Sequence, residues 1–185
     1  LAYGTDGTHR VHVLRPAHNW AALHVLRVKD ERLGGTLIEG LNELEMVEGE
    51  LWANVLPLQY HKASPCVGLR CPHMRRLRRQ YLNTQVARID INTGSVLGWV
   101  DLSALRDKQS SRVRRQPHHF VTNGIAYRRA PGRPQLLATG KQWDSMFDID
   151  LEASNLGPDH VRSRCDLYLS PTNSKAHRPS SFFPH

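Results

Sequence analysis

Residues 41–55 constrain the fold of this chain more than any other stretch. Apolar residues recur at every second position on either side of the turn-prone pair Glu48-Gly49; they are Leu44, Met46, Leu51, Ala53 and Val55. Alternation with a period of two is typical of β-strands that bury one face, and two such strands around a short turn form a hairpin. The pattern therefore predicts a β-hairpin that packs one face against the core.

Three segments share one arrangement, in which a strand of small residues is followed by a loop and an alternating strand. They begin at residues 1, 51 and 136. With residues 56–80 set aside, the starts lie about 50 and about 60 residues apart, and repeats of roughly 40 to 50 residues are typical of β-propeller blades. Asn92-Thr93-Gly94 supplies a turn between two further strands. We therefore expect an all-β, propeller-type chain that requires no long helix, although residues 102–107 could form a short one.

Two regions depart from this pattern. Residues 56–80 contain three prolines and a late basic run, and they interrupt the strands as an insertion. Residues 152–185 are rich in Pro, Ser and His, a composition that favours a divergent and poorly ordered tail. The expected organisation is one domain over residues 1–151, interrupted at 56–80 and followed by the tail at 152–185.

Length and composition set the remaining limits. A chain of 185 residues with 39% hydrophobic content is long enough to bury a core, and no apolar run is long enough to span a membrane. No targeting leader is visible ahead of the first strand. Because the first residues already have the pattern of a folded strand, we expect the chain to begin partway through its fold.

The net charge of +8 is concentrated in one place. Residues 56–80 contain six cations and no acidic residue; the cations are Lys62, Arg70, Arg75, Arg76, Arg78 and Arg79. The rest of the chain has an ordinary balance of charge. Basicity is therefore a property of this segment, and it does not make the fold a nucleic-acid binder.

Three ordered stretches together resemble the plant-type glutaminyl-peptide cyclotransferases. They are residues 41–55, V-A-R-I-D-I-N-T-G-S-V-L-G-W-V-D-L-S from Val86, and N-G-I-A-Y from Asn123 with A-T-G-K-Q-W-D-S-M-F-D-I-D-L from Ala138. The resemblance implies a five-bladed β-propeller, of which this chain would hold the later blades. It also implies conversion of the N-terminal glutamine of peptides or proteins to pyroglutamate, with release of ammonia. The family reaction needs no metal or organic cofactor, and the family is associated with the secretory pathway.

The resemblance assigns roles to individual residues. Asn42 matches the family's substrate-binding asparagine, whose amide both donates and accepts hydrogen bonds. Lys141 matches the active-site lysine, and we take it as the catalytic candidate because its charge can stabilise a developing oxyanion. Where the family has a second tryptophan after W-A-N-V, this chain has Leu56, and the pattern resumes near Tyr81. Either Leu56 or Tyr81 would then be the substrate-binding wall.

Other features of these stretches have ordinary structural interpretations. Asparagine before a strand is commonly a turn former, and a single surface lysine commonly has no function. We expect three tryptophans to fill space in the core and three aspartates to face solvent or bond turns; they are Trp52, Trp99, Trp143, Asp144, Asp148 and Asp150.

The resemblance places the family's catalytic glutamate ahead of the region that matches Leu1, and this sequence has no counterpart to it. Glu43 and Glu45 are close in sequence, but alternation directs both away from the face that carries Asn42. We therefore assign neither as the catalytic acid. A non-catalytic propeller fragment, which binds or is a remnant, is the first alternative function.

Two further alternatives concern the basic segment. Cys66, Cys71 and His73, with His61 upstream, could form a zinc site, but their spacing is not one of the strong zinc patterns, and we expect no metal. The run R-R-L-R-R could bind nucleic acid through phosphate contacts, but it lacks interleaved aromatic residues, and we expect no nucleic-acid partner. An exposed basic loop, or translated intron sequence, accounts for the segment better.

Overall fold

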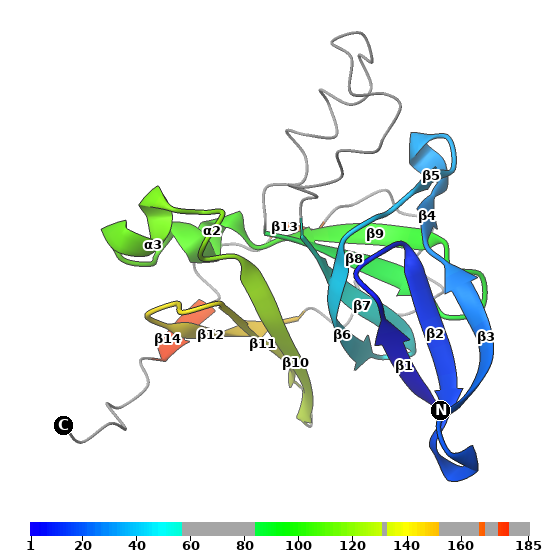
Figure 1. The fold of residues 1–185 in the computed structure, drawn as a ribbon. Coiled ribbons are helices and arrows are strands. Elements are labelled where there is room, and N and C mark those ends of the chain that lie inside the picture. Colours follow the sequence, from blue (N-terminus) through cyan, green and yellow to red (C-terminus); the bar gives the residue numbers. More distant parts are fainter. Residues whose placement is uncertain (57–83, 131–132, 152–166, 169–173, 178–185) are drawn as a thin grey trace, which may run out of the picture.

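The computed structural model describes residues 1–56, 84–130, 133–151, 167–168 and 174–177. Strands dominate these residues, and Figure 1 shows three sheets that follow one another across the molecule. The prediction of an all-β chain is confirmed. Each of the segments that begin at residues 1, 51 and 136 lies in a different sheet.

The strands of the sheets are as follows. The first sheet contains β1 (Ala2–Thr5), β2 (Arg10–Arg15) and β3 (Ala21–Arg27) in that order. A two-stranded ribbon follows, formed by β4 (Lys29–Asp30) and β5 (Thr36–Leu37). The middle sheet is the meander β6 (Leu41–Val47), β7 (Glu50–Val55), β8 (Gln85–Asp90) and β9 (Val96–Asp101), with β13 (Leu167–Tyr168) parallel to β9 at its edge. The third sheet contains β10 (Thr122–Ala130), β11 (Arg133–Gly140), β12 (Met146–Asp150) and β14 (Ser174–His177).

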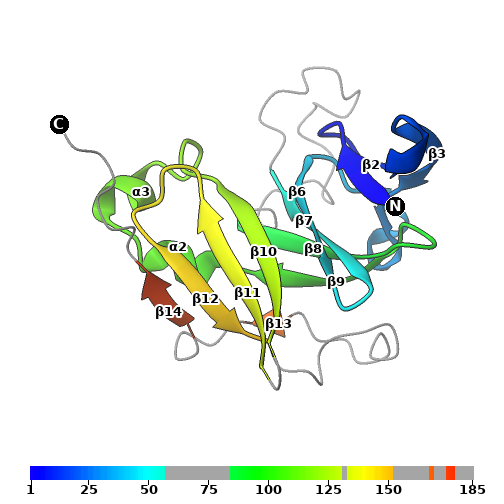
Figure 2. The ribbon, with the colours of Figure 1, turned by 90° about the horizontal axis from the view of Figure 1, so that it is seen from below.

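Helices are short and lie between the strands. The 3-10 turns are Pro16–His18 and Glu31–Leu33, and the α-helices are α2 (Ser103–Asp107) and α3 (Ser111–Arg115). The expected short helix at 102–107 is confirmed by α2. Figure 2 shows α2 and α3 beside the loop that joins β11 to β12. Among the described residues, no helix has the length and apolar character needed to cross a membrane.

The predicted hairpin is formed by β6 and β7. Glu48 and Gly49 both have positive φ, 46° and 87°, which is the backbone of a tight hairpin turn whose twist matches that of the strands. The prediction of one buried face is wrong for β7, because every residue of this strand is buried. Met46 was expected in the core but is 38% exposed. The strand β7 lies between two cores, so its two faces are covered by different sheets.

The two cores lie on opposite sides of the middle sheet. Trp52 belongs to the core shared with the third sheet, together with Val86, Ile125, Leu136 and Phe147. The alternate residues of β7 belong to the core shared with the first sheet and the β4–β5 ribbon; that core includes Val11, Val28, Leu51, Ala53, Val55 and Trp99. The expected core positions of Trp52, Trp99 and Trp143 are confirmed, because all three are at least nine-tenths buried.

Candidate functional site

Three backbone segments approach one another closely just before Asn42, and this approach fixes the start of the strand that carries it. The Gly40 amide donates to the Gly7 carbonyl at 3.1 Å, and the Gly40 carbonyl accepts from the Leu56 amide at 2.8 Å. Gly40 has a φ of +83°, and a Cβ added to it would lie 2.1 Å from the Leu56 carbonyl oxygen. Only glycine fits this backbone and this spacing. The start of β6 is therefore held against both the β1–β2 turn and the end of β7.

Asn42 lies at an irregular point of β6. Leu41 pairs with Val55 and Leu44 pairs with Ala53, so Asn42 and Glu43 together oppose one residue, Asn54. Such a bulge interrupts alternation and re-aims side chains. The assumption of strict alternation between Asn42 and Glu43 is therefore wrong, and alternation does not separate Glu43 from Asn42. Glu45 accepts a hydrogen bond from the Tyr127 amide of β10 at 3.0 Å. Asn42 itself is half-buried.

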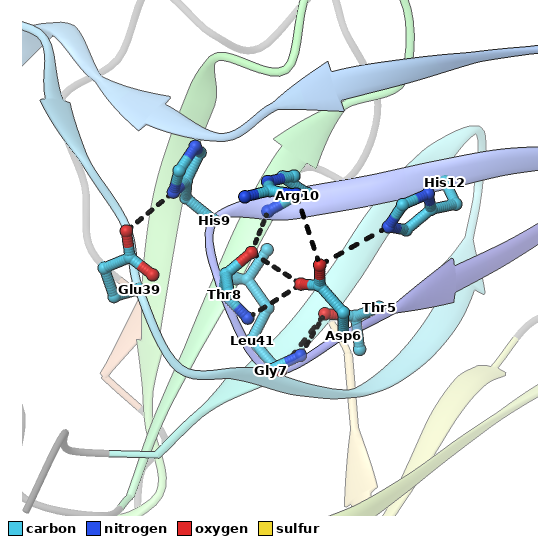
Figure 3. Close-up of polar contacts among 9 residues, drawn as sticks. All are labelled: Thr5, Asp6, Gly7, Thr8, His9, Arg10, His12, Glu39 and Leu41. Carbon is cyan, nitrogen blue, oxygen red and sulfur yellow. Dashed lines mark hydrogen bonds and ion pairs between the residues drawn. The ribbon is translucent and has the colours of Figure 1, made fainter. Parts of the chain in front are cut away.

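The turn β1–β2 is a network of polar side chains, shown in Figure 3. Asp6 accepts hydrogen bonds from the amide and the hydroxyl of Thr8, and these bonds are the main cause that lowers the pKa of Asp6 to about 2. Thr5 donates its hydroxyl to the Leu41 carbonyl at 3.2 Å. His9 Nδ1 lies 2.6 Å from the Glu39 carboxylate, one residue before Gly40. The β1–β2 turn therefore holds residues 39–41, which directly precede Asn42, in place.

Lys141 follows β11 in a turn that is also held by several contacts. Its amide donates to the Val121 carbonyl at 2.8 Å, and its side chain is exposed. Trp143 closes over this turn, since its indole N–H donates to the Phe120 carbonyl at 2.9 Å. A Cβ added at Gly140 would lie 2.4 Å from the Trp143 ring, so the turn again requires glycine. The backbone that carries Lys141 is therefore rigidly placed at the start of β10.

Asn42 and Lys141 lie at the same end of two adjacent sheets. The strands β6 and β10 are neighbours, because the Tyr127 amide donates to Glu45 at 3.0 Å. Further along both strands, Arg129 pairs with Glu48 at 3.3 Å, so β6 and β10 run in the same direction. Asn42 is at the start of β6, and the Lys141 turn lies against the start of β10. Figure 1 shows β6 in the middle sheet and β10 at the facing edge of the third sheet.

The remaining predicted residues fall into two groups. Leu56 is half-buried and lies at this same end, bonded to Gly40. Tyr81 lies outside the described residues, as do the basic segment beyond Leu56 and the proposed zinc ligands Cys66, Cys71, His73 and His61. Within the part of the chain that the structure describes, no group of three or more His, Cys, Asp or Glu side chains could hold a metal ion.

Sequence reasoning missed two polar groups near this end. Both polar atoms of the Asn54 side chain and the hydroxyl of Thr122 are buried and have no hydrogen-bond partner among the described residues. Asn54 opposes the bulge that carries Asn42, and Thr122 begins β10. Buried polar groups are normally satisfied, and exceptions gather at functional sites. The sequence signal for Asn54 is an asparagine within the run L-W-A-N-V, where the neighbouring residues are apolar.

Comparison with known proteins places the chain in a family. The family model described as glutamine cyclotransferase matches residues 2–61 and 71–151. The chain belongs to the glutamine cyclotransferase family. It is similar to the glutaminyl-peptide cyclotransferase of Arabidopsis thaliana, with 29% identity over 169 residues. That match covers 88% of this chain and 41% of the relative, so the chain spans about two fifths of the relative's length. The unmatched residues 62–70 lie inside the expected insertion.

Proposed function

We propose that this chain takes part in converting the N-terminal glutamine of peptides or proteins to pyroglutamate. The observation that carries the proposal is the placement of Asn42 and Lys141 at the same end of the neighbouring strands β6 and β10. We also propose that the three successive sheets are later blades of a β-propeller, because each consists mainly of consecutive antiparallel strands. In such a fold the shared end of the inner strands would be the mouth of the channel.

The reaction is an intramolecular acyl transfer. The α-amine nitrogen of glutamine attacks the side-chain carboxamide carbon, a C–N bond forms, and the bond to the amide nitrogen breaks. One proton leaves the attacking nitrogen and one reaches the departing nitrogen, so that ammonia is released and no water is consumed. The protein must hold both ends of one glutamine together and stabilise the charge on the carbonyl oxygen.

The proposed roles follow from the chemistry of each side chain. The Asn42 amide, placed by the bulge, would accept from and donate to the substrate carboxamide. The exposed ammonium group of Lys141 would stabilise the oxyanion, and the turn beneath it would limit its movement. Leu56, or Tyr81 in its place, would line the apolar wall that excludes water.

Proton transfer requires a group other than these. Asp6 is unsuited to donate a proton, because a pKa of about 2 keeps its carboxylate ionised at neutral pH. Glu50 is also unsuited, because its carboxylate binds Arg88 and Trp52 deep in the middle sheet. We therefore assign the proton shuttle to neither of these two carboxylates.

The test combines turnover with binding. A peptide that begins with glutamine is incubated with the chain, and ammonia release and the mass of the product are followed. Lys141→Ala and Asn42→Ala are each expected to weaken transition-state stabilisation by about 2 kcal/mol or more. Lys29→Ala and Asn92→Ala are matched controls on other parts of the surface and should retain the wild-type rate. Where the wild type releases ammonia, unchanged rates in both site variants would contradict the proposal.

Binding distinguishes the non-catalytic alternative. If the chain binds the glutamine peptide but releases no ammonia, the binding residues are correctly placed and the chain lacks turnover by itself. If peptides that begin with glutamine, glutamate or pyroglutamate bind equally, the site does not recognise the substrate carboxamide, and the proposal fails.

A further inference from the structure

A second basic surface lies on the described part of the fold, apart from the segment 56–80. Residues 103–119 contain five cations, Arg106, Lys108, Arg112, Arg114 and Arg115, and one acidic residue, Asp107. On and after α3, the exposed side chains include Arg114, Arg115, His118 and His119, which we call the α3 basic surface. No ion pair is observed for its two arginines within the described residues. This charge is therefore available to a partner.

The α3 basic surface is fixed to the turn that carries Lys141. The Arg112 guanidinium donates to the Gln142 carbonyl at 2.8 Å and to Asp144 at 3.2 Å, and it lies 4.5 Å from the centre of the Phe120 ring. Val113 is the buried residue of α3 and belongs to the core shared with the third sheet. Arg112 and Val113 thus hold α3 in one orientation, with Arg114 and Arg115 outward.

A buried glutamine between α2 and α3 also holds this part of the chain against the segment that follows Lys141. Gln109 is 4% exposed; its carbonyl oxygen accepts from the amides of Asp144 and Ser145 at 3.0 and 3.2 Å, and its amide donates to the Ser145 carbonyl at 3.1 Å. Ser110 donates its hydroxyl to Asp144. This bond, followed by the contact with Arg112, lowers the pKa of Asp144. The Asp144 carboxylate is occupied by these contacts and does not neutralise Arg114 or Arg115.

We propose that the α3 basic surface selects substrate peptides that carry acidic residues shortly after the N-terminal glutamine. The inference rests on the proposed function, in which the glutamine is held near Lys141. Arg112 contacts the residue next to Lys141, and Arg114 and Arg115 follow within one helical turn. An extended peptide advances about 3.3 Å per residue, so a carboxylate within the first few positions after the glutamine can reach this surface. Complementary charge at the rim of a site raises specificity and the rate of association.

A peptide suits this surface better than a nucleic acid does. Base stacking on exposed aromatic rings supplies much of the affinity for single strands. Phe120 is the only Phe, Tyr or Trp among residues 103–120, and it is 7% exposed beneath Arg112. The α3 basic surface thus offers positive charge but no exposed Phe, Tyr or Trp ring from residues 103–120. Positive charge alone is suited to binding the side-chain carboxylates of an acidic peptide.

The experiment measures binding of labelled glutamine peptides to the full chain by fluorescence anisotropy. Three peptides of equal length carry glutamate, serine or lysine at the positions after the glutamine. Arg114→Gln/Arg115→Gln is expected to weaken binding of the glutamate peptide about three- to tenfold and to leave the serine peptide unchanged. The matched control is Arg128→Gln/Arg129→Gln, which removes the same charge from the far part of β10 and should leave both affinities unchanged.

The outcomes separate the inference from the proposed function. The inference is supported if the glutamate peptide binds more tightly than the serine and lysine peptides, if added salt reduces this difference in affinity, and if the difference is lost in Arg114→Gln/Arg115→Gln. Equal losses for all three peptides, or the same loss in the control variant, would overturn it while the Lys141 and Asn42 tests stand. The inference would also be overturned, in favour of a nucleic-acid partner, by two results together. These are binding of an unrelated oligonucleotide through these arginines at physiological salt, and equal affinity for the three peptides. Equal affinity for peptides with and without the N-terminal glutamine would instead contradict the proposed function.

Discussion

A buried ion pair in the middle sheet gives the sharpest prediction about stability. Glu50 is 1% exposed and Arg88 is 7% exposed. The Arg88 guanidinium donates to both carboxylate oxygens of Glu50, at 2.8 and 2.7 Å, and the Trp52 indole donates to the same carboxylate at 3.0 Å. Arg88 also lies over the Trp52 ring, 5.8 Å from its centre. The two charges therefore satisfy each other inside the sheet.

Removing one partner leaves the other charge buried without compensation. Two charged hydrogen bonds are each worth about 1.5–3 kcal/mol, and breaking a buried ion pair from one side typically costs about 3–5 kcal/mol. We expect Arg88→Met to lower the free energy of unfolding by about 3–5 kcal/mol, and Glu50→Leu to lower it by a similar amount. The double variant removes both charges, and we expect it to cost far less than the sum of the single variants.

Urea denaturation of the four proteins, with linear extrapolation to water, measures these differences. Arg129→Met is the control, because its ion pair with Glu48 is at the surface and the Arg129 side chain is 81% exposed; we expect a change within about 0.5 kcal/mol. A loss below about 1 kcal/mol for Arg88→Met would show that the pair is not buried as described. Additive losses in the double variant would show that Glu50 and Arg88 do not stabilise each other.

Three further predictions concern single residues. Gly40→Ala should lower the midpoint of thermal unfolding, because its Cβ would collide with the Leu56 carbonyl at a φ of +83°; an unchanged midpoint would refute the close approach. Asp6 should titrate near pH 2 in an NMR titration, below its ordinary 3.8, so its contribution to stability is present above about pH 4 and is lost as the pH falls through about 2; titration at its ordinary value would refute the turn network. Burial and the hydrogen bond to Glu48 raise the pKa of Tyr127 from 10.0 to about 12, so its contribution is present below pH 10 and is lost as the pH rises through about 12. Ultraviolet titration of wild type against Tyr127→Phe isolates this group, and a difference spectrum with a midpoint near 10 would contradict it.

The elements that could be predicted from the sequence are those with a local signal. Glu48-Gly49 requires a tight turn, so the β6–β7 hairpin follows from a few residues. The short helix α2 and the turn at Asn92-Thr93-Gly94 are local in the same sense. The burial of both faces of β7 depends on which sheets cover it, and the local alternation of Leu51, Ala53 and Val55 does not show this.

The parts of the site that were not predicted arise from contacts between distant residues. The bulge at Asn42 and Glu43 is visible only in the pairing with β7, because nothing in L-N-E-L marks an extra residue. The attachment of α3 to the Lys141 turn joins residues about 30 positions apart through Gln109 and Arg112. Sequence reasoning assigned basicity to residues 56–80 alone and missed the run S-R-V-R-R at 111–115, although this run is visible in the sequence. Its position beside the Lys141 turn depends on contacts between distant residues and could not be read from charge alone.

The most direct test of the central claim is to locate a bound glutamine peptide on the chain by NMR, with the protein labelled and the peptide titrated. The account predicts that shifts concentrate at the start of β6, including the Asn42 side-chain amide, and at Leu56 and the Lys141 turn, and that a peptide beginning with serine produces none of them. Shifts confined to the opposite end, around the Glu48-Gly49 turn, or identical shifts with the serine peptide, would contradict a glutamine site at Asn42 and Lys141.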